Sequence, residues 1–296
     1  MAESTPLDLE RQGARAAEAL GALMAEATSL SLSLDAGTHG RRRAGVGETF
    51  WQYRDYAMGD PAHMIDWRQS ARAPRRLFVR ETEWETAATV RFWCRGGDGF
   101  DYSSGAQPTK KWRAMVMTLA MAIALNRGGE KIGLIADGMP ARRGPRAVMG
   151  IADALIGQHD ATESSEIGLP LPPPGTTHAV YISDFYQETD ALLTRLKALA
   201  ASGCRIHLVE VTDPAEETFP FTGRTIFQSP GDQKHRRLFG DADAVRHAYL
   251  AAREAHREAL LATAQRYGFN LIRHRTDHGA MRALSALQFA ISEGQV

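Results

Sequence analysis

The chain has 296 residues and a mass of 32.4 kDa, enough for one large domain or two ordinary ones. Lys plus Arg and Asp plus Glu both total 35, so bulk charge argues against a nucleic-acid binder. Two cysteines are too few for a disulfide framework, which favours a reducing compartment. No apolar run approaches the length of a membrane span and no signal peptide is visible, so we expect a cytoplasmic protein without membrane insertion.

The first part of the chain is irregular. The elements expected there are a helix at 7–27, a short strand at 30–34, a surface loop at 37–47 and a short strand at 77–79. The loop holds four glycines and the run Arg41-Arg42-Arg43. This run is typical of a solvated loop, and a basic clamp for an acidic partner or a phosphate is the alternative.

Beyond residue 86, strands alternate with helices. The expected strands are 89–94, 131–136, 179–183, 205–211, 225–228 and 269–272, and the expected helices are 108–126, 146–156, 191–201, 241–267 and a final one near 277–291. The helix at 108–126 is apolar almost all round and must be covered on most faces. This alternation predicts an α/β fold with a doubly wound, mainly parallel sheet. Ligands of such sheets bind at the carboxyl ends of the strands.

A dense motif precedes this region. It comprises Tyr53–Asp60, Ile65–Arg72 and Val79–Glu81, and its distinctive members are Arg54, Tyr56, Gly59, Asp60, Asp66, Trp67, Arg68, Ser70 and Arg72. The motif resembles the bacterial family called domain of unknown function 58. That resemblance implies a von Willebrand factor A-like domain and frequent pairing with MoxR-type AAA+ ATPases. We therefore expect residues 1–85 to form an N-terminal helix and motif segment packed on a von Willebrand A-like domain at 86–296.

The motif has two interpretations. Asp60 and Asp66 lie close in sequence to Trp67 and several arginines, which suits either a docking surface or a buried network of ion pairs and turns. An irregular segment must satisfy its backbone groups with side chains, and Asp, Arg and Trp are able to do so. We favour the structural network, which would clamp the segment onto the sheet.

The resemblance also implies a metal site. The von Willebrand fold holds a divalent ion with Asp-x-Ser-x-Ser after the first strand, a Thr, and an Asp after a later strand, all of them hard oxygen ligands. Here the first loop places Arg95 at the Asp position and Gly97 and Gly99 at the Ser positions, whereas Asp184 matches the later Asp. Like charges about 4 Å apart cost roughly 4 kcal/mol at an effective dielectric near 20. We therefore expect a degenerate metal site in which Arg95 pairs with Asp184.

These observations favour a non-catalytic adaptor or scaffold with no cofactor. Its partner would be a protein, with a MoxR-type ATPase or a neighbouring-gene product as the leading candidate. The expected docking surface comprises residues 95–102, 137–143 and 184–187, and its interaction candidates are Arg95, Asp98, Asp101, Asp184 and Phe185. One alternative is a metal-dependent hydrolase with a rebuilt site at Asp98 and Asp184. A shifted metal site that uses Asp98, Asp101 and Asp184 is the rival to the Arg95–Asp184 ion pair. Another is nucleic-acid binding through Arg41–Arg43 and Arg75-Arg76.

Overall fold

The computed structural model describes residues 6–37, 49–58, 60, 62, 65–72, 76–83, 87–136, 138–160, 168–228 and 236–293. The chain divides into two compact units: a main body, Met1–His39 with Ala88–Val296, and a motif unit, Gly40–Ala87. This division differs from the expected one, because the first helix belongs with the sheet and not with the motif segment. Packing of the motif segment on the main body stays a prediction.

The main body contains a five-stranded sheet in the order β4-β3-β5-β6-β9. The strands are β3 (Thr89–Cys94), β4 (Lys131–Leu134), β5 (His178–Ser183), β6 (Arg205–Thr212) and β9 (Asn270–Arg275). Every neighbouring pair is parallel. The predicted fold class, a doubly wound parallel sheet, is therefore confirmed.

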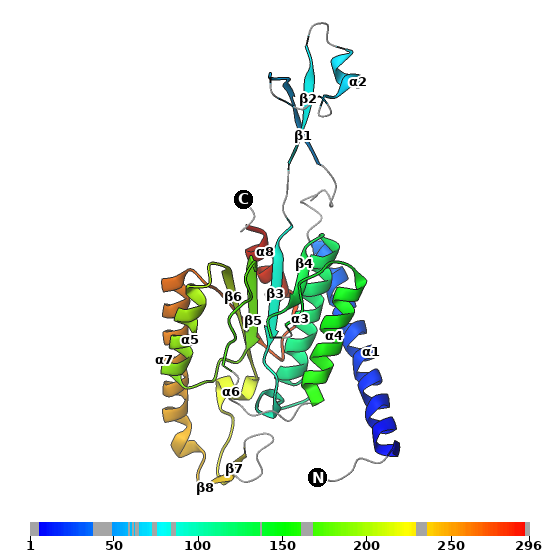
Figure 1. Ribbon diagram of the computed structural model, residues 1–296. Coiled ribbons are helices and arrows are strands. Elements are labelled where there is room, and N and C mark those ends of the chain that lie inside the picture. The colour runs from blue at the N-terminus through cyan, green and yellow to red at the C-terminus, as the bar shows by residue number, and fades with distance from the viewer. Residues whose placement is uncertain are drawn as a thin grey trace. The chain divides into compact units, whose positions relative to one another are not determined.

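Helices cover both faces of this sheet (Figure 1). They are α1 (Pro6–Gly37), α3 (Lys110–Arg127), α4 (Pro145–Asp160) and α8 (Met281–Glu293) on one face, and α5 (Thr189–Ala200) and α7 (Asp243–Tyr267) on the other. Strand alternation divides the core between the faces: Val180 and Ile182 of β5 join the first cluster, and Ala179 and Tyr181 join the second. Two hydrophobic cores thus hold the sheet from opposite sides.

The helix α3 is buried on nearly all sides, as its sequence predicts, because it lies between the sheet and a second layer. That layer includes α1, which continues to Gly37. The strand expected at 30–34 is therefore wrong. Leu23, Ala27 and Leu34 share a buried helical face, and the hydroxyl of Ser31 donates to the Thr28 carbonyl within the helix. Packing against α3 overrides the local alternation of Leu and Ser.

The excursion after β6 contains short elements. They are α6 (Pro214–Thr218) and the antiparallel pair β7 (Thr225–Gln228) and β8 (Arg236–Phe239), of which the sequence predicts β7. A 3-10 turn, η2 (Asp98–Phe100), follows β3. In the motif unit, β1 (Thr49–Asp55) pairs with β2 (Phe78–Glu83), and α2 (Trp67–Ser70) lies between them in sequence. None of the described helices combines the length and apolar character needed to cross a membrane.

Candidate functional site

A polar site lies at the carboxyl end of the sheet. β3 is the first strand of the sheet in sequence and has β4 on one side and β5 on the other, which makes the β3/β5 boundary a topological switch point. Arg95 directly follows β3, and Asp184 directly follows β5. The backbone N–H of Arg95 donates to the carbonyl of Ile182 at 2.9 Å. The two positions that the sequence singles out therefore adjoin each other.

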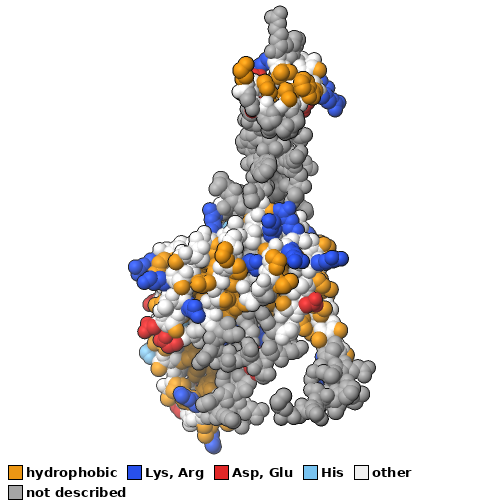
Figure 2. Space-filling view, in the orientation of Figure 1, with side chains coloured by type: hydrophobic (Ala, Val, Ile, Leu, Met, Phe, Trp, Pro, Cys, Tyr) orange, Lys and Arg blue, Asp and Glu red, His pale blue; other side chains and the backbone are white. Residues whose placement is uncertain are grey.

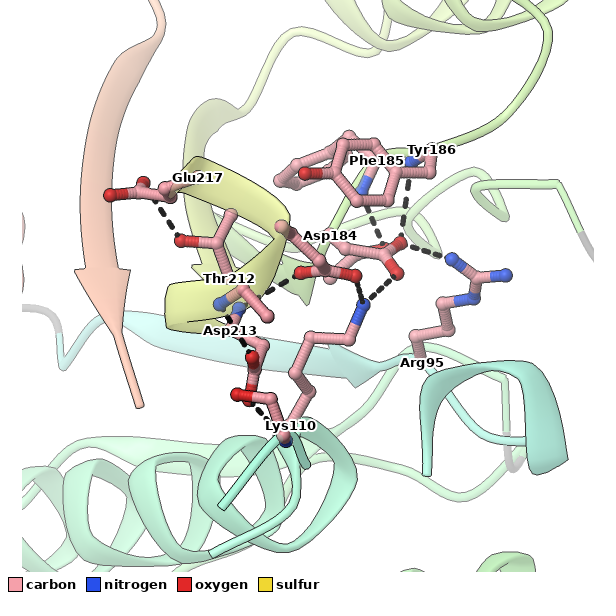
Figure 3. A network of polar contacts seen from close by, with 12 residues as sticks. Arg95, Lys110, Asp184, Phe185, Tyr186, Thr212, Asp213 and Glu217 are labelled. Atoms are coloured by element: carbon pink, nitrogen blue, oxygen red, sulfur yellow. Dashed lines mark hydrogen bonds and ion pairs between the residues drawn. The ribbon is translucent and has the colours of Figure 1, made fainter. Parts of the chain in front are cut away.

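Arg95 and Asp184 form the predicted ion pair. Nη1 of Arg95 donates to Oδ1 of Asp184, and Figure 3 shows the guanidinium directed at the carboxylate. The Asp184 side chain is 2% exposed and that of Arg95 is 15% exposed. A carboxylate this deeply buried needs a charged or hydrogen-bonding partner, and Arg95 supplies one from the neighbouring strand end.

A second cation, Lys110, occupies the other oxygen of Asp184 (Figure 3). Its Nζ lies 2.9 Å from Oδ2 of Asp184 and 2.5 Å from Oε1 of Glu216, and its side chain is 2% exposed. The ammonium also faces the rings of Tyr186 and Phe100, with centroids at 5.2 and 5.5 Å. Lys110 is the first residue of α3, where the helix dipole disfavours a cation, so the two carboxylates must compensate for its position.

The carboxylate of Glu216 is fixed by α6. Asp213 is the N-cap of this helix, and Oε2 of Glu216 accepts from the Asp213 N–H at 2.8 Å in a capping box. Burial raises the pKa of Glu216, and the attraction of Lys110 lowers it in part. The formal charges of Arg95, Lys110, Asp184 and Glu216 cancel, so the cluster is neutral as a whole.

Asp213 also ties the loop before α3 to the end of β6. Its Oδ2 accepts from the backbone N–H of Ser104 and from Nε2 of Gln107, both at 3.0 Å. Burial raises the pKa of Asp213, but these hydrogen bonds, with that from the Ala215 N–H, leave it below its usual value. The loop after β3 is thus anchored at both ends, by Arg95 and by Asp213.

An outer group of side chains links α6 to α7. Nε of Arg253 donates to the Tyr186 hydroxyl and Nη2 contacts Oε1 of Glu217, each at 3.1 Å. Thr212 donates to the same Glu217 oxygen. Burial raises the pKa of Tyr186, and Glu216 raises it further, so the phenol stays neutral and accepts from Arg253. These contacts hold Tyr186 in place beside the Arg95–Asp184 ion pair.

A divalent ion does not fit these residues. The positions Arg95, Gly97 and Gly99 offer no side-chain oxygen, and both oxygens of Asp184 are held by cationic side chains. Gly97 has φ 81° and ψ 159°, a conformation open in practice only to glycine, so a Ser at this position would be strained. Across the described residues, no three or more His, Cys, Asp or Glu side chains are grouped as a metal site requires, and Asp98, Asp101 and Asp184 all fall within those residues.

The other predicted interaction residues lie near this site with different exposures. Asp98 begins η2 and Asp101 is its C-cap, and both are partly exposed. Phe185 is 0% exposed and packs in the core beneath α5, so its ring is not part of the surface, contrary to expectation. Asp137 and Arg41–Arg43 lie outside the described residues.

Several motif residues build local turns within the motif unit. Asp66 is the N-cap of α2 and accepts from the Gln69 N–H at 2.9 Å and from the Tyr53 hydroxyl at 3.1 Å. Ser70 accepts from the Phe78 N–H at 2.9 Å, and Asp60 accepts from the Ala57 N–H at 2.9 Å. These hydrogen bonds form turns at exposed and part-buried positions within the unit. The buried network of ion pairs and its clamp onto the sheet stay predictions.

Other motif residues face outward. Trp67 is 63% exposed, and Arg68 and Arg72 are exposed beside it in sequence. Figure 2 shows hydrophobic and basic side chains gathered together on the described surface of this unit. Tyr56 is partly exposed, Gly59 lies outside the described residues, and Arg54 belongs to β1.

The fold and site define a doubly wound α/β protein whose switch point is closed by its own ion pairs. A family profile described as "Protein of unknown function DUF58" matches residues 52–259. The chain belongs to this family, as its motif indicates. No curated protein and no solved structure matches the chain.

Sequence reasoning missed Lys110 and Glu216, which complete the site. The available signal was the pair Lys110-Lys111 at the start of a helix that is otherwise apolar almost all round. Both lysines are 2% exposed. A lysine that must be buried needs a carboxylate, and Asp184 was already placed at the same end of the sheet.

Proposed function

We propose that this protein is a non-catalytic adaptor that binds a protein partner at the carboxyl end of its sheet. The observation that supports this proposal is the occupation of Asp184 by Arg95 and Lys110. In a metal-dependent site the carboxylate would hold an ion that completes its coordination with a partner. Here the chain supplies the positive charge itself, so recognition needs no bound ion.

The surface available for docking surrounds Arg95. This residue is partly exposed and carries N–H donors beyond the one that contacts Asp184, and Asp98 and Asp101 provide negative charge on the following turn. Gly96, Gly97 and Gly99 keep side chains out of the space between them. A shallow surface that carries charges of both signs suits the polar rim of an interface. Charges in such a rim determine which partner binds and how fast it associates.

The proposed partner is a MoxR-type AAA+ ATPase or a protein encoded beside the gene. This choice rests on the family resemblance alone. We propose further that the protein is cytoplasmic and bacterial, as that partnership requires.

Binding to the purified candidate ATPase tests the proposal. The double variant Asp98→Asn, Asp101→Asn removes two docking charges and should weaken binding by about tenfold or more. The control is Asp153→Asn, an exposed carboxylate on α4, which should leave the affinity unchanged. Biolayer interferometry with the nucleotide-free ATPase measures the affinity of the double variant and of the control, each with and without EDTA.

Three outcomes would contradict the adaptor proposal. The first is that no candidate partner binds the wild-type chain, and the second is that EDTA abolishes binding to the nucleotide-free ATPase. The third is manganese-dependent hydrolysis by the purified chain that disappears in Asp184→Ala while the fold persists, which the hydrolase alternative requires.

A further inference from the structure

An aromatic cavity lies next to the Lys110 cluster. Its volume is about 520 Å³, within the range of pockets that bury a ligand or a large side chain. Its walls come from η2, α6, α7 and the β7–β8 hairpin. The aromatic side chains that line it are Tyr102, Phe219, Phe221, Phe227, Phe239 and Tyr249.

These rings pack edge-on and face-on around the cavity. The Phe219 ring lies 4.9 Å from that of Tyr249 and 5.3 Å from that of Phe221, and Phe227 lies 5.5 Å from Phe239. Phe227 is turned inward, while its neighbour Ile226 is 56% exposed on the opposite face of the strand. Two four-residue strands are marginal alone, so the ring contacts hold this hairpin on the main body.

The segment before the hairpin is held in a costly conformation. Phe219 is the C-cap of α6 with φ 45°, in the left-handed region that a bulky residue rarely adopts. Arg246 of α7 fixes it, because its Nε and Nη2 donate to the carbonyls of Phe219 and Phe221 at 3.0 Å each. The strain is retained where it directs an aromatic ring at the cavity.

The polar end of the cavity selects an uncharged occupant. Its charged lining residues are Lys110 and Glu216, which pair with each other. Burial raises the pKa of Tyr102, and of Tyr249 to about 12, so both phenols stay neutral. A charged occupant would lose water and meet no unpaired counter-ion among the described lining residues, whereas an apolar ring would contact the aromatic walls.

The cavity is continuous with the proposed docking surface. Gly99, which lines it, lies in η2 between Asp98 and Asp101, and Lys110 joins its wall to Asp184. We propose that the cavity receives an uncharged aromatic side chain of the docked protein partner, an inference that rests on the proposed adaptor function. Aromatic anchors in desolvated pockets commonly carry most of an interface's binding energy.

Filling the cavity from inside tests this proposal. Ala248 of α7 lines the cavity, so Ala248→Leu places a larger side chain in it, and Val245→Phe does the same from the preceding turn. The matched control is Ala255→Leu, an exposed alanine about two turns further along α7 and outside the lining. Urea unfolding of each variant establishes that the fold is kept.

Two binding measurements are made on each variant. The first is an NMR titration with N-acetyl-L-tryptophanamide, an uncharged aromatic probe, and with the α-amide of N-acetyl-L-aspartic acid, whose free side-chain carboxylate is charged. The second is affinity for the purified MoxR-type ATPase. We expect the aromatic probe to bind the wild type and the control in preference to the charged probe. Both filled variants should lose at least about tenfold in affinity for the probe and for the ATPase.

The outcomes separate this proposal from the adaptor proposal. If the filled variants keep the wild-type affinity for the ATPase, the proposed aromatic anchor is overturned. If the same variants have lost binding of the aromatic probe, the cavity is then assigned to a free small molecule. Equal binding of the two probes overturns the preference for an uncharged ring. If neither the ATPase nor a protein encoded beside the gene binds the wild type, the adaptor proposal and the anchor that rests on it both fail. The probe titration still decides whether the cavity selects aromatic groups.

Discussion

Replacing Lys110 with methionine removes the cation that joins Asp184 to Glu216 and keeps a side chain of similar length. At the observed separations of 2.9 and 2.5 Å, the attraction of each contact is about 6 kcal/mol at an effective dielectric near 20. The cost of taking the three charged groups out of water offsets much of this. Removing one partner leaves the others buried, which typically costs about 3–5 kcal/mol. Arg95 remains on Asp184, so we expect a loss near the lower value, about 3 kcal/mol.

The loss should depend on pH. The pKa of Glu216 is raised by burial, and Lys110 is one of the groups that lower it, so the variant's Glu216 will bind a proton more readily. A protonated Glu216 carries no unpaired charge, so the deficit of Lys110→Met should shrink as the pH falls from 8 to 5. The wild type, in which the ammonium limits the rise in the Glu216 pKa, should show a smaller recovery.

Urea unfolding followed by circular dichroism at pH 8 and pH 5 measures both effects. Lys197→Met, at an exposed position of α5, is the control and should change the free energy of unfolding by no more than about 0.5 kcal/mol. A deficit for Lys110→Met that equals the control and is flat with pH would refute the buried cluster.

Three further predictions concern the main body. Burial lowers the pKa of His207 to about 3, so the unfolded chain binds more protons than the folded chain below pH 6.5. Roughly 3 kcal/mol of stability should therefore be lost by pH 4. The variant His207→Gln should reduce that loss in acid unfolding curves. Gly97→Ser should destabilise the fold by about 1–3 kcal/mol because Gly97 has a positive φ. Gly99→Ser should be nearly neutral, because a Cβ at Gly99 would lie 3.8 Å from its nearest atom, Nη2 of Arg95. Equal shifts in the melting temperatures of the two variants would contradict this. Burial raises the pKa of Cys94 to about 12, so Ellman's reagent should modify the half-buried Cys204 first and Cys94 only after unfolding.

The main body follows closely from sequence periodicity because its elements are long and its strands are buried. β5 and β6 read as short continuous apolar runs, which is typical of central parallel strands. The errors occur where local pattern and packing disagree. The Leu–Ser alternation at 30–34 suits a strand as well as a helix, and contact with α3 decides for the helix. β1 escapes prediction because a register shift between Phe50 and Gln52 breaks its alternation.

One half of the candidate site was predictable and the other half was not. Arg95 and Asp184 follow two apolar strands, β3 and β5, that the parallel topology places side by side, so their opposite charges meet at one end of the sheet. Glu216 comes from a five-residue helix inside an irregular excursion, where no period indicates which way a side chain points. Residue spacing therefore does not identify Glu216 as the partner of Lys110. The sequence does indicate that a buried lysine at this position needs a carboxylate partner.

Lys110 belongs to both proposed binding features, because it pairs with Asp184 at the docking end and lines the aromatic cavity. A variant at Lys110 will disturb both features at once and separates neither. Asp98 and Ala248 are better probes, because the first is a surface charge and the second lines the cavity from α7. If partner affinity falls in both variants, and falls further when they are combined, docking and anchoring act on one interface. If only the Asp98 variant loses affinity, the partner is held by the charged rim and the cavity serves another purpose.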